Sequence, residues 1–134
     1  ADADQTASAP ASPTKPRVLI AEDEHAIATG LRWTLEAEGM TVHVVGLARE
    51  VIPAIDAFKP DVMLLDLSLP DGDGRDVYEQ IAGRLPVIFS TGSLGERDLV
   101  ASGHGNVVVL MKPYTSDELL RTVHRILSSE EDNA

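Results

Sequence analysis

The chain has 134 residues, with 22 Asp and Glu against 11 Lys and Arg, a formal net charge of -11 at pH 7, and no cysteine. This length predicts one domain whose core needs no covalent staples, and the lack of thiols excludes disulfides, thiolate metal sites and thiol nucleophiles. The acidic balance would repel a phosphate backbone, so we expect no direct binding of nucleic acid. The apolar runs are too short to cross a bilayer, and no secretory signal opens the chain, which favours a cytoplasmic protein without membrane insertion.

The two ends of the chain differ in composition from the middle. Residues 1–16, ADADQTASAPASPTKP, contain no large apolar side chain. Such a segment cannot bury enough apolar surface to offset the entropy of ordering, so we expect a flexible linker or tail. Residues 17–128 are expected to form the domain, and residues 129–134 an acidic C-terminal tail.

Within the domain, short apolar runs alternate with amphipathic stretches, which predicts strands alternating with helices. The expected strands are residues 18–21, 41–45, 61–66, 86–91 and 107–111. The expected helices are residues 25–38, 48–58, 74–82, 96–102 and 116–127.

Individual residues add detail to the prediction of the first two helices. Gly39 is placed to cap the end of the first helix, and Pro53 predicts that the second helix is kinked or starts late. At 100° per residue, Trp33 lies off the inward-facing stripe of the first helix and is available as an anchor for a partner. That stripe is expected to comprise Ile27, Leu31, Thr34 and Leu35.

Five strand–helix units in about 110 residues predict an α/β fold with a parallel five-stranded sheet between two helical layers. The natural arrangement is a flavodoxin-like (βα)5 sandwich with strand order 2-1-3-4-5. In such sheets, ligands bind beyond the carboxyl ends of the strands, near the reversal between strands 1 and 3. Residues that follow different strands are therefore expected to meet at one edge.

The strand ends carry polar and charged residues suited to phosphoryl chemistry. Asp66 ends an apolar strand expected to be covered on both faces, while Glu22 and Asp23 follow the first strand. Thr91 ends the fourth strand and Lys112 follows the fifth. Three neighbouring carboxylates repel one another and favour a bound Mg²⁺. One carboxylate oxygen can then act as a nucleophile toward a phosphoryl group that the hydroxyl and the ammonium surround.

Each of these residues also has an ordinary structural explanation when taken alone. Acids such as Glu22 and Asp23 are favourable at a helix N-terminus, Asp66 could cap a turn, Thr91 could be a turn residue, and Lys112 could be a solvated surface amine. Four suitable residue types at successive strand ends are hard to obtain by chance. The combination therefore favours phosphorylation of Asp66.

The segments VLIAEDE, LLDLSLPDGDG, PVIFSTG and VLMKPY, in this order, resemble the receiver domain of two-component response regulators. The resemblance covers about residues 17–128 and implies that Asp66 is the phosphoacceptor. It further implies that Asp23, Asp66 and the main-chain carbonyl of Ser68 bind Mg²⁺, and that Glu22 holds the metal through water.

The same resemblance assigns roles on the other side of the expected site. Thr91 and Lys112 would contact the phosphoryl oxygens, and the peptide bond between Lys112 and Pro113 is expected to be cis. Receiver domains usually carry Tyr or Phe three residues before the site lysine, as a ring that reports phosphorylation, but Val109 stands there in this chain. This departure and the Thr-Gly after the fourth strand resemble an atypical receiver subgroup. Phe89 and Tyr114 are the nearest aromatic substitutes, and both are expected to be packing residues.

The resemblance implies a two-component or phosphorelay function. Asp66 would receive its phosphoryl group from a histidine kinase or a histidine phosphotransfer protein, and the domain would catalyse only its own phosphorylation and dephosphorylation. The domain would be the terminal receiver of a hybrid kinase or a stand-alone receiver. Two surfaces are candidates for a homodimer interface: the first helix, and the face of residues 96–102, 107–111 and 116–127.

Two alternatives of other classes remain at this point. The first is a pseudo-receiver that acts as a protein-binding or dimerisation module without phosphorylation. The second is a flavodoxin-like enzyme that uses FMN, although the acids after the first strand would repel its phosphate.

Overall fold

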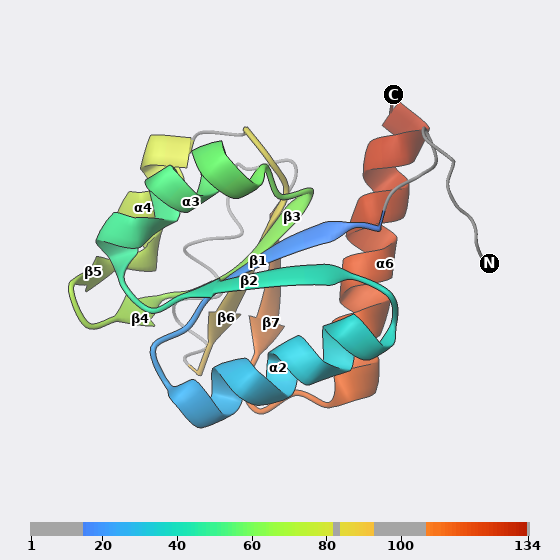
Figure 1. The fold of residues 1–134 in the computed structure, drawn as a ribbon, viewed down its shortest axis with the longest axis horizontal. Coiled ribbons are helices and arrows are strands. Elements are labelled where there is room, and N and C mark those ends of the chain that lie inside the picture. The colour runs from blue at the N-terminus through green and yellow to red at the C-terminus, as the bar shows by residue number, and fades with distance from the viewer. Residues whose placement is uncertain (1–14, 82–83, 93–106, 134) are drawn as a thin grey trace.

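The computed structural model describes residues 15–81, 84–92 and 107–133 (Figure 1). The expected helix at residues 96–102 and most of the expected N-terminal linker lie outside the described residues. Among the residues described, no helix is long and apolar enough to cross a membrane.

The central sheet has five parallel strands in the order β2-β1-β3-β6-β7. Numbered among themselves along the chain, these strands follow the predicted order 2-1-3-4-5, so the expected flavodoxin-like topology is confirmed. Two of the strands, β3 and β6, begin one residue later than predicted. The bounds are β1 Arg17–Ala21, β2 Thr41–Val45, β3 Val62–Asp66, β6 Val87–Thr91 and β7 Val107–Met111.

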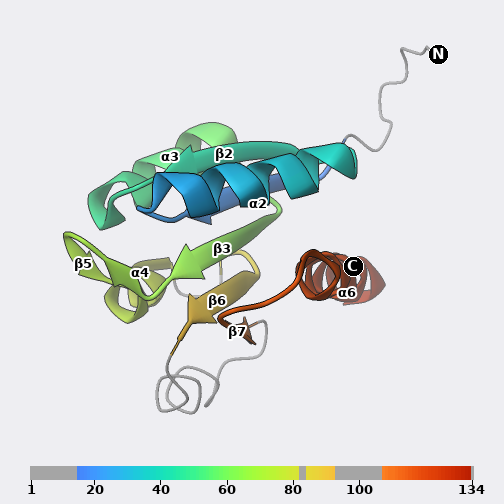
Figure 2. The same cartoon turned by 90° about the horizontal axis from the view of Figure 1, so that it is seen from below.

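Helices cover both faces of this sheet (Figures 1 and 2). Side chains of α3 and α4 form one apolar cluster with the sheet, and side chains of α2 and α6 form a second cluster on the opposite face. The described helices are α2 His25–Ala37, the 3₁₀-helix η1 Ala48–Glu50, α3 Val51–Phe58, α4 Gly74–Ile81 and α6 Ser116–Asn133.

The strands supply both clusters because successive side chains of a strand point to opposite faces. In β3, Met63 and Leu65 pack in the cluster of α3 and α4, whereas Val62 and Leu64 pack in the cluster of α2 and α6. Every residue of β3 is buried. The uninterrupted apolar run therefore reflects a strand covered on both sides, as expected for a parallel sheet.

The first two helices follow the sequence with one correction. Gly39 has a φ of 89°, the left-handed conformation of a helix C-terminal cap. Pro53 lies in the first turn of α3, which follows η1 directly, so its missing N–H costs no helical hydrogen bond. Trp33 is 69% exposed, but Ile27, predicted to face inward, is 37% exposed. The buried stripe of α2 is Ala28, Leu31 and Leu35.

Two further elements differ from the prediction. The last helix was expected to end at residue 127, but α6 continues through Asn133, so most of the expected acidic tail is helical. The turn after β3 forms a two-stranded antiparallel hairpin, with β4 at Ser68–Leu69 and β5 at Gly72–Asp73. The sequence predicted a turn here but no strand pairing.

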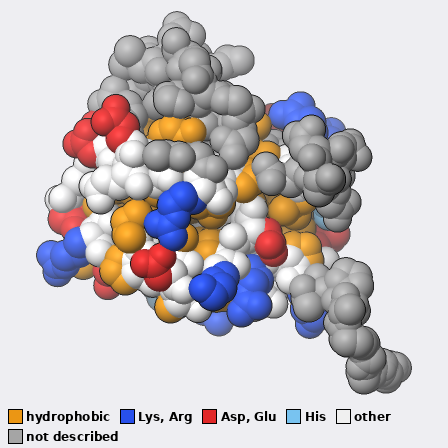
Figure 3. All heavy atoms as spheres, turned by 90° about the horizontal axis from the view of Figure 1, so that it is seen from above, with side chains coloured by type: hydrophobic (Ala, Val, Ile, Leu, Met, Phe, Trp, Pro, Cys, Tyr) orange, Lys and Arg blue, Asp and Glu red, His pale blue; other side chains and the backbone are white. Residues whose placement is uncertain are grey.

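Figure 3 shows the molecule from above, after a 90° turn from the view of Figure 1. On this face, Lys and Arg side chains are interspersed with Asp and Glu. Elsewhere among the described residues, Nη2 of Arg84 and Oδ1 of Asp56 form an ion pair at 2.8 Å. Both side chains are largely exposed, so their mutual stabilisation is small.

Candidate functional site

Asp66 is the last residue of β3, the central strand of the sheet, and it is only 5% exposed. Its Oδ1 accepts a hydrogen bond of 2.9 Å from the N–H of Ser68. Its Oδ2 lies 3.3 Å from Nζ of Lys112. Both oxygens of this buried carboxylate are therefore held in defined directions, one by the following hairpin and one by a cation.

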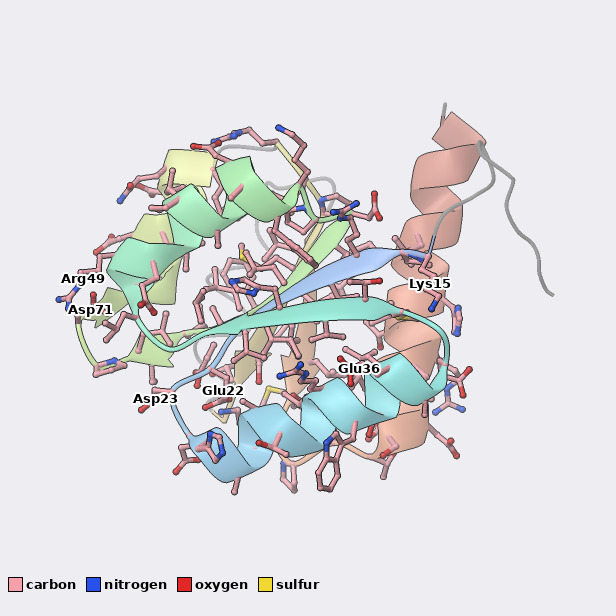
Figure 4. All side chains as sticks on the ribbon, in the orientation of Figure 1. Lys15, Glu22, Asp23, Glu36, Arg49 and Asp71 are labelled. Atoms are coloured by element: carbon pink, nitrogen blue, oxygen red, sulfur yellow. The ribbon has the colours of Figure 1, made fainter. Side chains whose placement is uncertain are left out.

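The two acids after β1 lie beside Asp66. The parallel ladder with β2 extends one residue further, because the N–H of Glu22 donates to the carbonyl of Val45 at 3.0 Å. Glu22 is buried and accepts a hydrogen bond from the N–H of Glu24, whereas Asp23 is exposed. Both residues lie just beyond the end of β1, before α2 (Figure 4). Carboxylate oxygens of Glu22, Asp23 and Asp66 all lie within 4.8 Å of one another.

Lys112 reaches this acidic cluster from the far strand of the sheet. Its N–H donates to the carbonyl of Thr91 at 2.8 Å, which fixes the chain just beyond β7 against the end of β6. Its Nζ lies 3.3 Å from Asp66 and 3.6 Å from Oε1 of Glu22. The peptide bond between Lys112 and Pro113 is cis, as predicted.

The pKa values of Glu22 and Lys112 are both shifted by burial and by the neighbouring charges of the site. Burial raises the pKa of Glu22, the Glu24 N–H opposes that shift, and the Asp66 carboxylate adds to it. Burial alone would lower the pKa of Lys112, but Asp66 and Glu22 outweigh burial and raise it. Lys112 therefore stays an ammonium, while the carboxylates remain short of positive charge.

The donor set fits a hard divalent cation. When all the groups are ionised, three carboxylates and one ammonium carry a net charge of -2, which a divalent cation would neutralise. Carboxylate and main-chain carbonyl oxygens are the ligands that Mg²⁺ prefers. Glu22, Asp23 and Asp66 could therefore hold Mg²⁺. The carbonyl of Ser68, two residues beyond Asp66, stays a predicted ligand.

Thr91 ends β6 at the same edge and is 2% exposed. The backbone bond between Thr91 and Lys112 joins their segments, and the ladder pairs Asp66 with Ser90, the residue before Thr91. The structure thus brings all the predicted residues to one edge. The catalytic and metal-binding roles of Asp66, Thr91, Lys112, Glu22, Asp23 and Ser68 stay predictions.

The two candidate substitutes for the missing reporter ring lie on opposite faces of the sheet. Val109 and Phe89 belong to the cluster of α3 and α4, where the Phe89 ring is buried and packs edge-on against Tyr78 at 5.3 Å. Tyr114 packs against the other cluster, beside α2 and α6. Both aromatic residues therefore contribute to packing, as predicted.

The Tyr114 phenol also lies near the polar end of the site, which the sequence did not indicate. Burial raises its pKa, and the hydroxyl of Ser90 acts in the opposite direction as a neighbouring donor. The Ser90 hydroxyl is itself buried, and within the described part of the chain it has no hydrogen bond of good geometry. Tyr114 and Ser90 thus form a close polar approach rather than a well-formed hydrogen bond.

A groove of about 450 Å³ runs beside Lys112, between α2 and the segment that connects β7 to α6. Ile27 and Gly30 line one side of it, and Pro113 and Tyr114 line the other. A Cβ added to Gly30 would meet no atom within 4 Å, so this side of the groove is open. The exposed Ile27 is explained by this position, since it faces the groove rather than the core.

Comparisons with known proteins agree with this geometry. Residues 18–124 match the family model described as the response regulator receiver domain. Curated relatives include the cell cycle response regulator CtrA of Brucella ovis and of Brucella suis, each 32% identical over 122 residues. Each alignment covers 88% of this chain and 53% of the relative, so the chain spans about half the length of these relatives.

Solved structures show the same similarity. The signal receiver domain of a putative Luxo repressor protein from Vibrio parahaemolyticus is 29% identical with a TM-score of 0.76, and the match covers 89% of this chain and 95% of that one. A CheY-like receiver domain protein from Methanospirillum hungatei is 26% identical with a TM-score of 0.82, over 90% of this chain and 100% of that one. The fold, the edge where the acids gather and the family match over most of the chain lead to one conclusion: this chain belongs to the response regulator receiver domain family.

Proposed function

We propose that this chain is a phosphoacceptor domain, in which Asp66 takes a phosphoryl group from a phosphohistidine of a histidine kinase or a histidine phosphotransfer protein. The observation that carries the proposal is the setting of Asp66. A nearly buried carboxylate lies among two further acids and is held by the Ser68 N–H and the Lys112 ammonium. Such an arrangement costs stability unless a cation or a transferred group uses it.

In the transfer step, a carboxylate oxygen of Asp66 attacks the phosphorus atom of phosphohistidine. A P–O bond forms, the P–N bond breaks, and its electron pair stays on the imidazole nitrogen. Hydrolysis later returns the carboxylate, because water attacks phosphorus and the P–O bond to Asp66 breaks. The same residue is therefore the nucleophile in one step and the leaving group in the other.

The neighbouring groups supply electrostatic stabilisation. The Lys112 ammonium lies 3.3 Å from Asp66. After the transfer it would contact the oxygens of the phosphoryl group and stabilise their negative charge. Thr91, buried at the end of β6, would offer its hydroxyl to another of these oxygens. Mg²⁺ bound by Glu22, Asp23, Asp66 and the Ser68 carbonyl would neutralise negative charge on the acids and on the phosphoryl oxygens.

Labelling with acetyl phosphate tests this proposal directly. The wild-type chain is incubated with acetyl phosphate, with Mg²⁺ or with a chelator, and the gain of one phosphoryl group is followed by intact-protein mass spectrometry. We expect labelling of the wild type only with Mg²⁺, and none of Asp66→Asn. The matched control is Asp61→Asn, because Asp61 lies at the opposite end of β3 and accepts a hydrogen bond from the Arg17 N–H.

Each other outcome has a definite meaning. Persistent labelling of Asp66→Asn would overturn the assignment of Asp66, and labelling in chelator would overturn the requirement for Mg²⁺. A wild-type chain that is never labelled would favour the alternative, a pseudo-receiver that binds partners without phosphorylation.

The arrangement of the whole protein is a separate part of the proposal. The curated relatives extend well beyond the region matched here. A terminal receiver of a hybrid kinase and a stand-alone receiver would use the same site, and the complete open reading frame distinguishes the two.

A further inference from the structure

Asp71, at the tip of the β4–β5 hairpin, makes an unusual contact with another loop (Figure 4). Its Oδ1 accepts a hydrogen bond of 2.5 Å from the N–H of Ala48, and its Oδ2 one of 3.1 Å from the N–H of Arg49. Both donors belong to the first turn of η1. One carboxylate therefore satisfies two backbone donors that the start of a helix leaves unpaired.

The residue at the N-terminal end of η1 does not cap this helix itself. The residue before η1 is Leu47, which provides no side-chain cap. Asp71 is 23 positions away from Ala48 in the sequence, so the bond joins two separate loops. The contact also lowers the pKa of Asp71, chiefly through the Ala48 N–H.

On one side, the contact leads to the phosphoacceptor strand. The hairpin begins at Ser68, whose N–H holds Oδ1 of Asp66. It ends at Asp73 and is followed by Gly74, the first residue of α4, where an added Cβ would lie 2.7 Å from the carbonyl oxygen of Asp66. The hairpin is thus packed tightly against the backbone that presents Asp66.

On the other side, the contact leads to the acids after β1. The N–H of Gly46 donates to Oε1 of Glu50, which closes the loop before η1. A Cβ on Gly46 would lie 3.8 Å from Cα of Asp23 and 3.9 Å from the carbonyl oxygen of Glu22. This loop therefore lies against the turn that carries two of the expected metal ligands.

We propose that Asp71 is a positioning residue for the metal site, because it holds the loop of Asp66 and Ser68 at a fixed distance from the loop of Glu22 and Asp23. The inference rests on the proposed function and deepens it. Asp71 touches neither metal nor phosphoryl group. Its effect passes through the start of η1 on one side and through the hairpin on the other.

Loss of this contact would weaken Mg²⁺ binding while leaving the chemistry intact. A freed hairpin shifts the Ser68 main chain, so the ligands no longer converge on one point. Residues that orient metal ligands typically change affinity by 10–100-fold, and we expect about tenfold for this more distant contact. Phosphorylation should then need more Mg²⁺ to reach half its maximal rate, while the rate at saturating Mg²⁺ stays near that of the wild type. A purely structural role would lower the folded fraction without moving the Mg²⁺ dependence of the folded protein.

The experiment measures Mg²⁺ binding to the whole chain by isothermal titration calorimetry, alongside the Mg²⁺ dependence of acetyl phosphate labelling. The variants are Asp71→Ala, which loses both acceptors, and Asp71→Asn, which keeps one. The matched control is Asp76→Asn, which removes the same charge from an exposed residue lining the same surface hollow as Asp71 and Arg49.

We expect the Mg²⁺ dissociation constant to rise about tenfold in Asp71→Ala, by less in Asp71→Asn, and less than twofold in Asp76→Asn. Equal dissociation constants for the Asp71 and Asp76 variants would overturn the inference. If Asp71→Ala does not fold, as judged by circular dichroism, the comparison of the two Asn variants decides. Weaker binding in the Asp71 variants of a chain that acetyl phosphate never labels would support the positioning role and refute the phosphoacceptor function, so the two failures are distinguishable.

Discussion

The Lys112→Met variant tests the electrostatic balance of the site. In the wild type, the ammonium lies 3.3 Å from Asp66 and 3.6 Å from Glu22. At an effective dielectric constant of about 20, each attraction is worth roughly 5 kcal/mol before desolvation is counted. Desolvation of the amine opposes this gain, and breaking a fully buried pair costs about 3–5 kcal/mol. Because the Lys112 side chain is 30% exposed, we expect the free energy of unfolding without metal to fall by less, about 1–3 kcal/mol.

Mg²⁺ should reverse most of this loss. In the variant, the divalent cation takes over the counter-charge that Lys112 supplied to Glu22 and Asp66, and it no longer experiences repulsion from a neighbouring ammonium. The stabilisation gained on adding Mg²⁺ should therefore be larger in Lys112→Met than in the wild type. Met retains most of the apolar stem of Lys, so loss of packing contributes little.

Urea denaturation measures the free energy of unfolding of the wild type and of Lys112→Met, each in chelator and in Mg²⁺. Lys15→Met is the matched control, since Lys15 is exposed and lies beyond the opposite end of β1 from Asp23 (Figure 4). Equal stability of Lys112→Met and Lys15→Met in chelator would show that Lys112 does not balance the buried acids. An equal response of the variant and the wild type to Mg²⁺ would refute the idea that ammonium and metal share one set of carboxylates.

Two other predictions concern backbone packing and pH. Gly74→Ala should lower the free energy of unfolding by about 1–3 kcal/mol, measured by urea denaturation, because the added Cβ would lie 2.7 Å from the Asp66 carbonyl oxygen and would force backbone to move; an unchanged stability would mean that the hairpin yields freely. In a Tyr78→Phe background, ultraviolet titration of Tyr114 should give a pKa above 10.0, chiefly because the phenol is partly buried. Since that pKa is raised by folding, the stability contributed by Tyr114 is fully present below pH 10.0 and is lost as the pH rises through the higher folded value. A pKa at or below 10.0 would contradict the partial burial of the Tyr114 ring.

The parts of the fold that the sequence predicted are those with a repeating local signal. The β3 run is apolar at every position before Asp66, which is typical of a strand covered on both faces. Strand order then followed from the alternation of strands and helices, and the meeting of Glu22, Asp66 and Lys112 followed from strand order. The order in which the chain connects its strands and helices therefore predicts that residues distant in sequence meet at one site.

The parts that the sequence did not predict depend on tertiary contacts or on weak local preferences. The β4–β5 hairpin has two residues in each strand, too few for an alternating pattern, and Asp71 contacts a loop 23 positions away. The end of α6 contains acidic residues that suggest a tail, yet it contains no Gly or Pro to stop the helix before Asn133. Ile27 matches the helical period of the core but faces a groove, a distinction that depends on where the chain beyond β7 lies.

The placement of the aromatic residues bears on how a phosphoryl group at Asp66 would be read by the rest of the domain. Phosphorylation can bias two conformations only through contacts that differ between them. Val109 is too small to exchange positions as a ring does, and Phe89 is locked between buried neighbours on its face of the sheet. Lys112, by contrast, both contacts Asp66 and lines the groove beside α2, and Tyr114 is two residues further along the chain in the same groove. Because Lys112 itself lines the groove beside α2, a movement of its ammonium would alter that groove directly. The same movement would reach Val109, on the opposite face of the sheet, only indirectly.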